Sequence, residues 1–173
     1  MNALKYLNLL FLLTLLVSTQ TFAESYFSLG VGQIKVDTDG GATKPFVADF
    51  RIGYEFDVHQ FEVAIMSSVK DDSLNSLTVD VPLVSSVFYR YSPYQAGSIK
   101  THLILGYSQV DVDSTFPSAP DASEQFTGGS YGIGFEESFN SIRNLKIKVE
   151  LMQLYRGDQL NINLFSLGLR YVF

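Results

Sequence analysis

Charged side chains that recur at alternate positions are the residues of this sequence with the clearest chemical potential. They carry both signs and fall in several separate segments: Arg51, Glu55, Glu62, Arg90, Glu136, Lys146, Lys148, Glu150 and Arg170. Paired carboxylates can act as a general acid and a general base. Charges enclosed together can instead form ion pairs, and they must do so because an unpaired buried charge is very costly. The mixture of signs favours a structural network in which Arg and Lys bridge to Glu.

The two histidines raise the possibility of hydrolysis. A Ser/His/acid site needs a base within hydrogen-bond reach of its nucleophile, held in place by a third group. His59 lies in a predicted short turn, and His102 lies on the polar row of a predicted strand. No serine follows His102 closely, because Leu103 and Ile104 come next. We therefore predict no catalytic residue.

Metal, cofactor and nucleic-acid sites are also not expected. The segment 37–40, Asp-Thr-Asp-Gly, hints at a calcium loop, but Lys35 occupies the place of the first ligand and no Glu follows at the required position. The chain has no cysteine, which excludes a thiolate metal site and a lipid-modified N-terminal cysteine. Gly132 and Gly134 lie on a predicted strand with no helix after it, so they form no nucleotide motif. A net charge of −6 disfavours nucleic acid as a partner.

The first 23 residues have the features of a cleaved signal peptide. Lys5 precedes an apolar run over 7–17, and Thr21-Phe22-Ala23 forms a small-x-small cleavage site. The run is short for a transmembrane helix, and polar residues end it at Ser18. The sequence thus predicts an exported protein with two parts: signal peptide 1–23, removed by cleavage, and one domain over 24–173.

Alternation of apolar and polar residues, typical of β-strands, runs through the rest of the chain. Eight segments show it: 26–36, 45–56, 60–69, 77–91, 99–110, 125–139, 145–152 and 165–173. The connections after the even segments are compact. Those after the odd ones are mostly longer and polar: 37–44, 70–76, 112–124 and the short 156–160. Pro82 interrupts one segment, and because it cannot donate a ladder hydrogen bond we expect it at a rim or a bulge.

The direction of the two faces decides the class of barrel. The polar face combines charges with repeated glycine and serine, which suits a narrow interior better than a solvent-facing surface. The apolar stretch from Phe46 to Phe56 would climb about 25 Å when tilted, the height of the apolar band of an outer-membrane barrel. We therefore expect Phe50 and Leu169 to face lipid. The alternative is a soluble, lipocalin-like barrel with its apolar face inside.

The last segment carries a more specific signal. Ser166, Gly168, Tyr171 and Phe173 resemble the terminal β-signal of bacterial outer-membrane proteins, which implies recognition by the barrel-assembly machinery during insertion. More broadly, 131–136 and 145–150 are similar to the small OmpA-like and OmpX-like outer-membrane barrel family. The resemblance implies an all-β, eight-stranded antiparallel up-and-down transmembrane barrel in the cell outer membrane. Because the resemblance covers the whole of 24–173, the peptidoglycan-binding activity of OmpA is not expected.

The expected function is a non-enzymatic one in the outer membrane. A side-chain-filled lumen would support loops that serve adhesion, partner contact or envelope integrity. The expected partners are outer-membrane lipid and lipopolysaccharide, the assembly machinery and an extracellular partner of the loops. The alternatives are a lipid-modifying outer-membrane enzyme, a soluble periplasmic binding barrel and a narrow gated pore.

Overall fold

The computed structural model describes residues 23–117, 120–139, 142 and 144–173, so the predicted signal peptide lies outside it except for Ala23. The alternating segments form long strands, as expected for residues whose side chains point in turn to two different environments. These strands are β1 (Glu24–Thr38), β3 (Phe46–Phe56), β4 (His59–Lys70), β7 (Leu83–Ala96), β8 (Ile99–Thr115), β9 (Ala122–Ser138), β10 (Leu145–Arg156) and β11 (Leu160–Val172).

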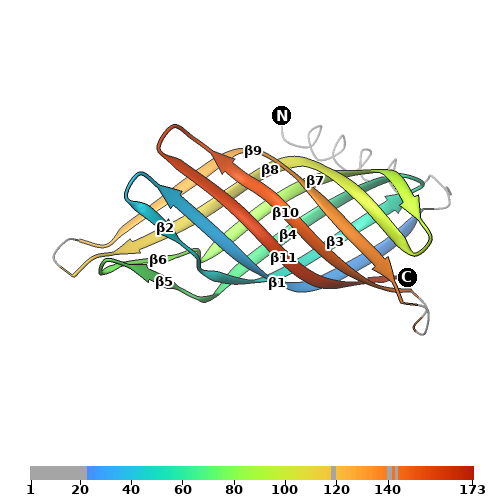
Figure 1. Cartoon of the computed structure of the whole chain (residues 1–173), viewed down its shortest axis with the longest axis horizontal. Helices are drawn as coiled ribbons and strands as arrows, with labels where there is room; N and C mark the ends of the chain where they lie inside the picture. Colours follow the sequence, from blue (N-terminus) through green and yellow to red (C-terminus); the bar gives the residue numbers. More distant parts are fainter. Residues whose placement is uncertain (1–22, 118–119, 140–141, 143) are drawn as a thin grey trace, which may run out of the picture.

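Each long strand pairs antiparallel with its neighbours in the chain, and β11 pairs with β1 to close the sheet (Figure 1). Leu29 of β1 lies opposite Phe50 on one side and Leu169 on the other. The result is the predicted closed, antiparallel barrel of eight strands. Closure removes both sheet edges and satisfies the backbone hydrogen bonds, which a membrane-spanning sheet requires.

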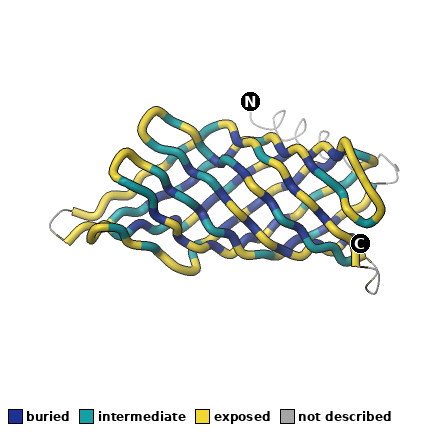
Figure 2. Tube along the Cα trace, in the orientation of Figure 1, coloured by how far each residue is buried: buried dark blue, intermediate teal, exposed yellow. Residues whose placement is uncertain are grey.

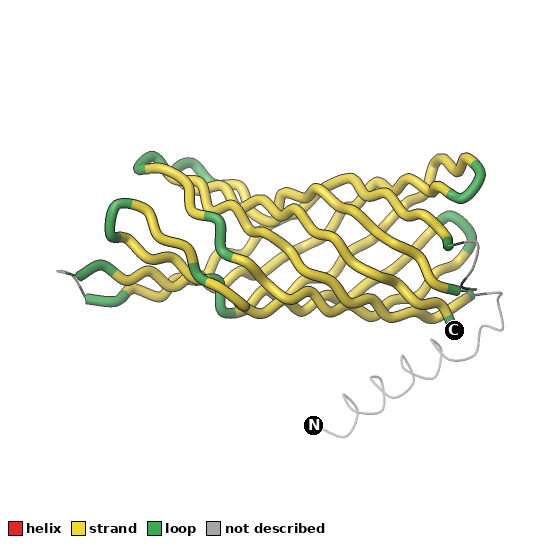
Figure 3. Tube along the Cα trace, turned by 60° about the horizontal axis from the view of Figure 1, so that its bottom comes forward, coloured by secondary structure: helices red, strands yellow, loops and turns green. Residues whose placement is uncertain are grey.

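The two ends of the barrel differ. One end has short turns and lies beside Glu24 and Phe173, and we call it the turn end. The other, the loop end, carries three additional short strands: β2 (Gly41–Thr43), β5 (Asp72–Leu74) and β6 (Leu77–Asp80). β2 pairs with β1, β5 pairs with β6, and β6 pairs with β8. Loops thus cap both ends of a wall made of strands (Figure 3).

Two expectations about these connections are wrong. The segment 77–91 is not one strand, because Val81 and Pro82 separate β6 from β7. Val79 and Val81 are buried, whereas the sequence pattern placed them on the same face as lipid-facing Val87. Pro82 therefore marks a change of register, since it has no N–H for the ladder. The predicted loop 112–124 is also too long, because β8 continues to Thr115 and β9 begins at Ala122.

The β8–β9 hairpin extends beyond the apolar wall. Each strand has 17 residues, which span about 40 Å along the barrel axis when tilted. The outer face of β8 is apolar from Leu103 to Tyr107 and becomes polar from Gln109 onward. The same change occurs on β1 between Val31 and Gln33. Since an apolar band of such barrels is about 25 Å tall, the loop end lies outside it.

Buried and exposed residues alternate along the strands (Figure 2), because successive side chains point to opposite faces of the wall. Phe50 and Leu169 point outward and are 45% and 46% exposed, whereas neighbouring Arg51 and Arg170 are fully buried inside. This arrangement confirms the predicted direction of the apolar face and contradicts a lipocalin-like interior. Among the described residues, no helix is long and apolar enough to cross a membrane.

Candidate functional site: the closed lumen

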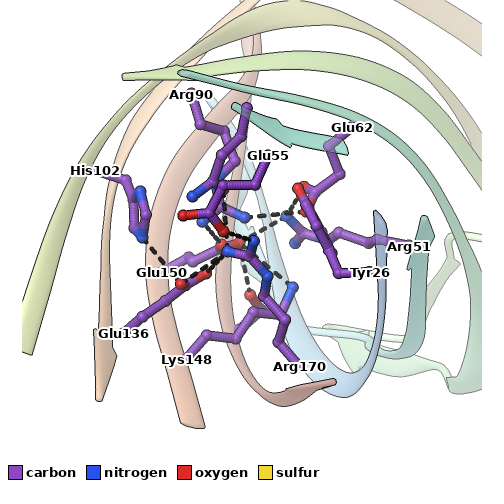
Figure 4. Close-up of polar contacts among 12 residues, drawn as sticks. Tyr26, Arg51, Glu55, Glu62, Arg90, His102, Glu136, Lys148, Glu150 and Arg170 are labelled. Atoms are coloured by element: carbon purple, nitrogen blue, oxygen red, sulfur yellow. Dashed lines mark hydrogen bonds and ion pairs between the residues drawn. The ribbon is translucent and has the colours of Figure 1, made fainter. Parts of the chain in front are cut away.

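The half of the lumen nearer the turn end is filled by charged side chains, which we call the ion-paired cluster. Its basic members are Arg51, Arg90, Lys100, Lys146, Lys148 and Arg170, and its acidic members are Asp49, Glu55, Glu62, Glu136 and Glu150. They come from every long strand except β1, and β1 adds Tyr26. Figure 4 shows Tyr26 and the labelled charged side chains of this cluster converging on the centre of the barrel.

Arg51 forms the most extensive contacts of the cluster. Its guanidinium lies 2.7 Å from Asp49 Oδ2, 2.9 Å from Glu62 Oε1 and 2.7 Å from Glu150 Oε2. Arg90 contacts the same two glutamates, with 3.0 Å between Arg90 Nη1 and Glu62 Oε2 and an ion pair to Glu150. Two arginines and two glutamates thus form a closed ring, which fits the planar fork of arginine.

Arg170 holds the second part of the cluster together. Its Nη1 lies 2.8 Å from Glu136 Oε2 and donates a 3.1 Å hydrogen bond to Gln60 Oε1, and its Nη2 pairs with Glu55. The guanidinium stacks 3.6 Å from the centroid of the Tyr26 ring, a cation–π contact. The Tyr26 hydroxyl in turn donates to Glu62 Oε2 at 3.1 Å. Tyr26 therefore links the two parts.

The lysines are held less tightly. Lys148 is fully buried, but its Nζ lies 3.7 Å from Asp49 Oδ2 and 3.9 Å from Glu150 Oε2, and it has no hydrogen-bond partner among the described residues. Lys100 and Lys146 lie closer to the turn end, partly exposed, and both pair with Glu55. Ionic contacts in this cluster thus range from bidentate to distant.

The structure brings all of the charged residues predicted for the lumen into this one cluster. Asp49 and Lys100, which lie on the same alternating polar rows and are expected inside for that reason, also join the cluster. The sequence prediction omitted Tyr26 and Gln60. No pattern marked these two residues, because a single polar or aromatic residue at a strand start is common.

His102 participates in an arrangement that the sequence did not predict. Its Nδ1 lies 2.8 Å from Ser92 Oγ, and its Nε2 lies 3.2 Å from Glu136 Oε2. These are the three residue types of a hydrolase site. However, Ser92 and His102 are buried and Glu136 is engaged by Arg170, so this trio is packed into the cluster rather than presented to a substrate.

Metal ligation has no candidate in the part of the chain that the structure describes, where no three His, Asp or Glu side chains are grouped suitably. In the segment 37–40, which hints at a calcium loop, Asp37 instead pairs with Lys35 at 2.6 Å.

A row of serines lies on the loop side of the cluster. Ser86 Oγ donates to Ser108 Oγ at 2.8 Å, and the hydroxyls of Ser108 and Ser130 are 2.9 Å apart. The three residues come from the adjacent strands β7, β8 and β9 and are all buried. Within the row, each buried hydroxyl thus has a hydrogen-bond partner that is another serine side chain.

The half of the lumen nearer the loop end is apolar, which the sequence analysis missed. Its buried side chains pack into one cluster that we call the apolar plug: Ile34, Val36, Val47, Ala64, Met66, Val79, Val81, Val84, Phe88, Ile104, Val110, Val112, Met152, Leu154, Ile162 and Leu164. The expectation of a lumen filled by glycine, serine and charge is thus correct for only half of its length. In that half, close packing of apolar side chains takes the place of the ion pairs.

The residues of the predicted assembly signal lie on the strand that closes the barrel. Ser166 and Gly168 are buried on the lumen side of β11, and Tyr171 and Phe173 point outward. The rings of Tyr171 and Phe173 are 5.6 Å apart, and each lies within 6.0 Å of the Phe27 ring on β1. The Phe173 amide donates to Ser25 O at 3.0 Å. The motif therefore forms part of the β1–β11 seam.

Known structures share this architecture. Ail of Yersinia pestis, solved with the heparin analogue sucrose octasulfate, is 20% identical, with a TM-score of 0.65 and coverage of 87% of this chain and 99% of that one. Neisserial surface protein A is 17% identical, with the same TM-score and coverage. The N-terminal barrel of Pseudomonas aeruginosa OprF is 16% identical, with a TM-score of 0.58 and coverage of 84% and 97%. These identities establish a shared fold only.

No curated protein sequence matches the chain significantly. The model of one protein family does match it, over residues 9–173, which include all the strands of the barrel. By that match, and with a closed wall that is apolar outside and ion-paired within, the chain belongs to the outer membrane protein beta-barrel domain family.

Proposed function

We propose that this protein is a non-enzymatic outer-membrane scaffold with a closed lumen, which presents its loop end at the cell surface for contact with partners. The observation that carries the proposal is the double filling of the lumen. Arg51, Arg90 and Arg170 are fully buried in the ion-paired cluster, and the apolar plug lies above them. An eight-stranded barrel with such an interior has no room for a diffusion path.

Planar-bilayer recording tests the closed lumen directly. We expect no steady single-channel openings from the purified, refolded protein at moderate voltages, because both halves exclude water. The control is an unrelated barrel of known conductance in the same bilayer. Steady openings with a reproducible conductance would overturn the scaffold and favour the narrow gated pore.

The competing function is a lipid-modifying enzyme, favoured by the contacts of His102 with Ser92 and Glu136. Their burial argues against it, since a nucleophile must reach its substrate. Incubation of the protein with lipopolysaccharide should release no acyl chains. Release that is lost in His102→Ala and kept in His59→Ala would establish the enzyme instead.

We also propose that residues 1–23 are removed on export. Short turns of outer-membrane barrels face the periplasm and longer loops face outward, so the chain would be inserted with Glu24 and Phe173 on the periplasmic side. N-terminal sequencing of protein from the outer-membrane fraction should begin at Glu24. A folded, heat-modifiable band in that fraction is also expected, whereas a mature chain found free in the periplasm would refute the location.

Ser166, Gly168, Tyr171 and Phe173 are proposed to engage the barrel-assembly machinery. In cells, Phe173→Ala should lower the amount of folded barrel, while Phe135→Ala, an outward aromatic outside the motif, should not. Spontaneous refolding of Phe173→Ala in detergent should be nearly normal. An equal defect in detergent would assign the effect to the Phe27–Tyr171–Phe173 contacts rather than to recognition.

A further inference from the structure

The loop end of the barrel contains a cavity of 660 Å³ that lies above the apolar plug. Its walls come from the end of β1 and the turn after it, from β6, β8 and β9, and from the β10–β11 hairpin. Val36, Val79 and Val112 form its floor and belong to the plug, so the cavity is closed below. A volume of this size is in the range of sites for small molecules.

The chemistry of the lining is uneven. The inner wall is apolar and includes an aromatic pair, Phe126 and Tyr155, with ring centroids 5.4 Å apart. Three exposed carboxylates also line the cavity: Asp39, Glu124 and Asp158. The lining contains no Lys or Arg, and none of these carboxylates forms an ion pair with a basic side chain of the described residues.

This combination selects one class of ligand. An apolar wall favours a hydrocarbon or aromatic body, and unpaired carboxylates favour a positive charge. Aromatic rings attract quaternary and primary ammonium groups through their negative faces. An anionic ligand would meet repulsion and no counter-charge. The acidic lining therefore does not suit a sulfated ligand such as the heparin analogue present with Ail.

We propose that the loop-end cavity binds a small amphipathic cation, with an apolar body against Phe126 and Tyr155 and an ammonium group near Asp39, Glu124 and Asp158. The proposal deepens the surface-contact function, on which it rests, by naming a ligand class for the loop end. The apolar plug makes the site a blind one, so that the ligand binds and leaves by the same opening. No passage through the lumen is implied.

Calorimetric titration of the protein in phosphatidylcholine nanodiscs tests the site with three probes. Hexyltrimethylammonium has both features, hexanesulfonate has the same chain with the opposite charge, and tetramethylammonium lacks the chain. We expect saturable binding of hexyltrimethylammonium at one site, and binding at least about tenfold weaker for the other two. Empty nanodiscs correct for partition into lipid. Equal binding of hexanesulfonate, or heats that never saturate, would overturn the proposal.

Two matched triple variants separate the site from general surface charge. Asp39→Asn/Glu124→Gln/Asp158→Asn should weaken hexyltrimethylammonium binding about tenfold. Asp71→Asn/Asp121→Asn/Glu137→Gln changes the net charge equally at exposed positions outside the cavity and should leave binding unchanged. All six side chains are exposed, so folding is preserved, and heat-modifiable migration verifies it. Equal loss in both variants would refute the site, while absence of conductance in the same preparation would leave the scaffold intact.

Discussion

The two halves of the lumen fill the same narrow space with opposite chemistry. Near the turn end, directional ion pairs join strands that are distant in sequence; Arg90 and Glu150 are 60 residues apart. Near the loop end, apolar side chains pack without direction. Directional contacts require the correct stagger of the barrel, whereas apolar packing tolerates repacking if volume is kept. We therefore expect the ionic half to depend on individual residues and the apolar half on total volume.

The largest loss of stability is expected for Arg51→Met. The substitution leaves Asp49, Glu62 and Glu150 without their shared partner in a buried site. Breaking such a pair from one side costs about 3–5 kcal/mol. Urea unfolding of the refolded protein in detergent or nanodiscs measures it. Arg156→Met, at an exposed position near the loop end, should change stability by less than about 0.5 kcal/mol. Similar effects of the two variants would show that the specific ion pairs of the cluster do not stabilise the barrel.

A somewhat smaller loss is expected for Leu164→Ala in the apolar plug. The side chain is 2% exposed, so its removal leaves a cavity that costs about 2–4 kcal/mol. On the same strand, Leu167 faces outward and is 44% exposed. Leu167→Ala should cost less than half as much, because lipid can fill the space. Leu164→Met should nearly restore the wild-type value, since the plug depends on volume. Failure of that rescue would show that the plug is as specific as the cluster.

The serine row lies between the ionic and the apolar halves of the lumen, and its removal is expected to have a smaller effect than either substitution above. Ser108→Ala removes a hydroxyl that contacts both Ser86 and Ser130 and leaves each with one partner fewer. We expect a loss of about 1 kcal/mol in urea unfolding, the usual value for a neutral hydrogen bond. Ser85→Ala, on the outer face of β7, is the control and should have little effect. No difference between them would mean that the row contributes only by its small volume.

Sequence patterning could predict the wall and the ionic half but not the apolar half. Strict alternation identified the strands, and charged residues on the inner rows identified the cluster. The individual pairs could not be predicted, because they depend on the stagger that brings Arg90 beside Glu150. Near the loop end the alternation continues, but the polarity of the two faces is exchanged: Val110 and Val112 point inward, and Asp111 between them points outward. That exchange was the signal for the plug. The predicted register before Pro82 was wrong, because Val79 and Val81 point inward and not toward lipid.

The smallest effect is expected for Lys148→Met, although Lys148 is as deeply buried as Arg51. Its ammonium lies 3.7 Å or more from its acidic neighbours and has no hydrogen bond among the described residues. The cluster also has more basic than acidic members, so the substitution brings its charges into balance. Methionine keeps most of the lysine stem and removes the cost of burying an ammonium that has no hydrogen-bond partner among the described residues. We expect the free energy of unfolding to change by no more than about 1 kcal/mol, compared with the loss of about 3–5 kcal/mol expected for Arg51→Met. Equal losses in the two variants would show that burial of a charge alone, and not its contacts, determines stability in the ionic half.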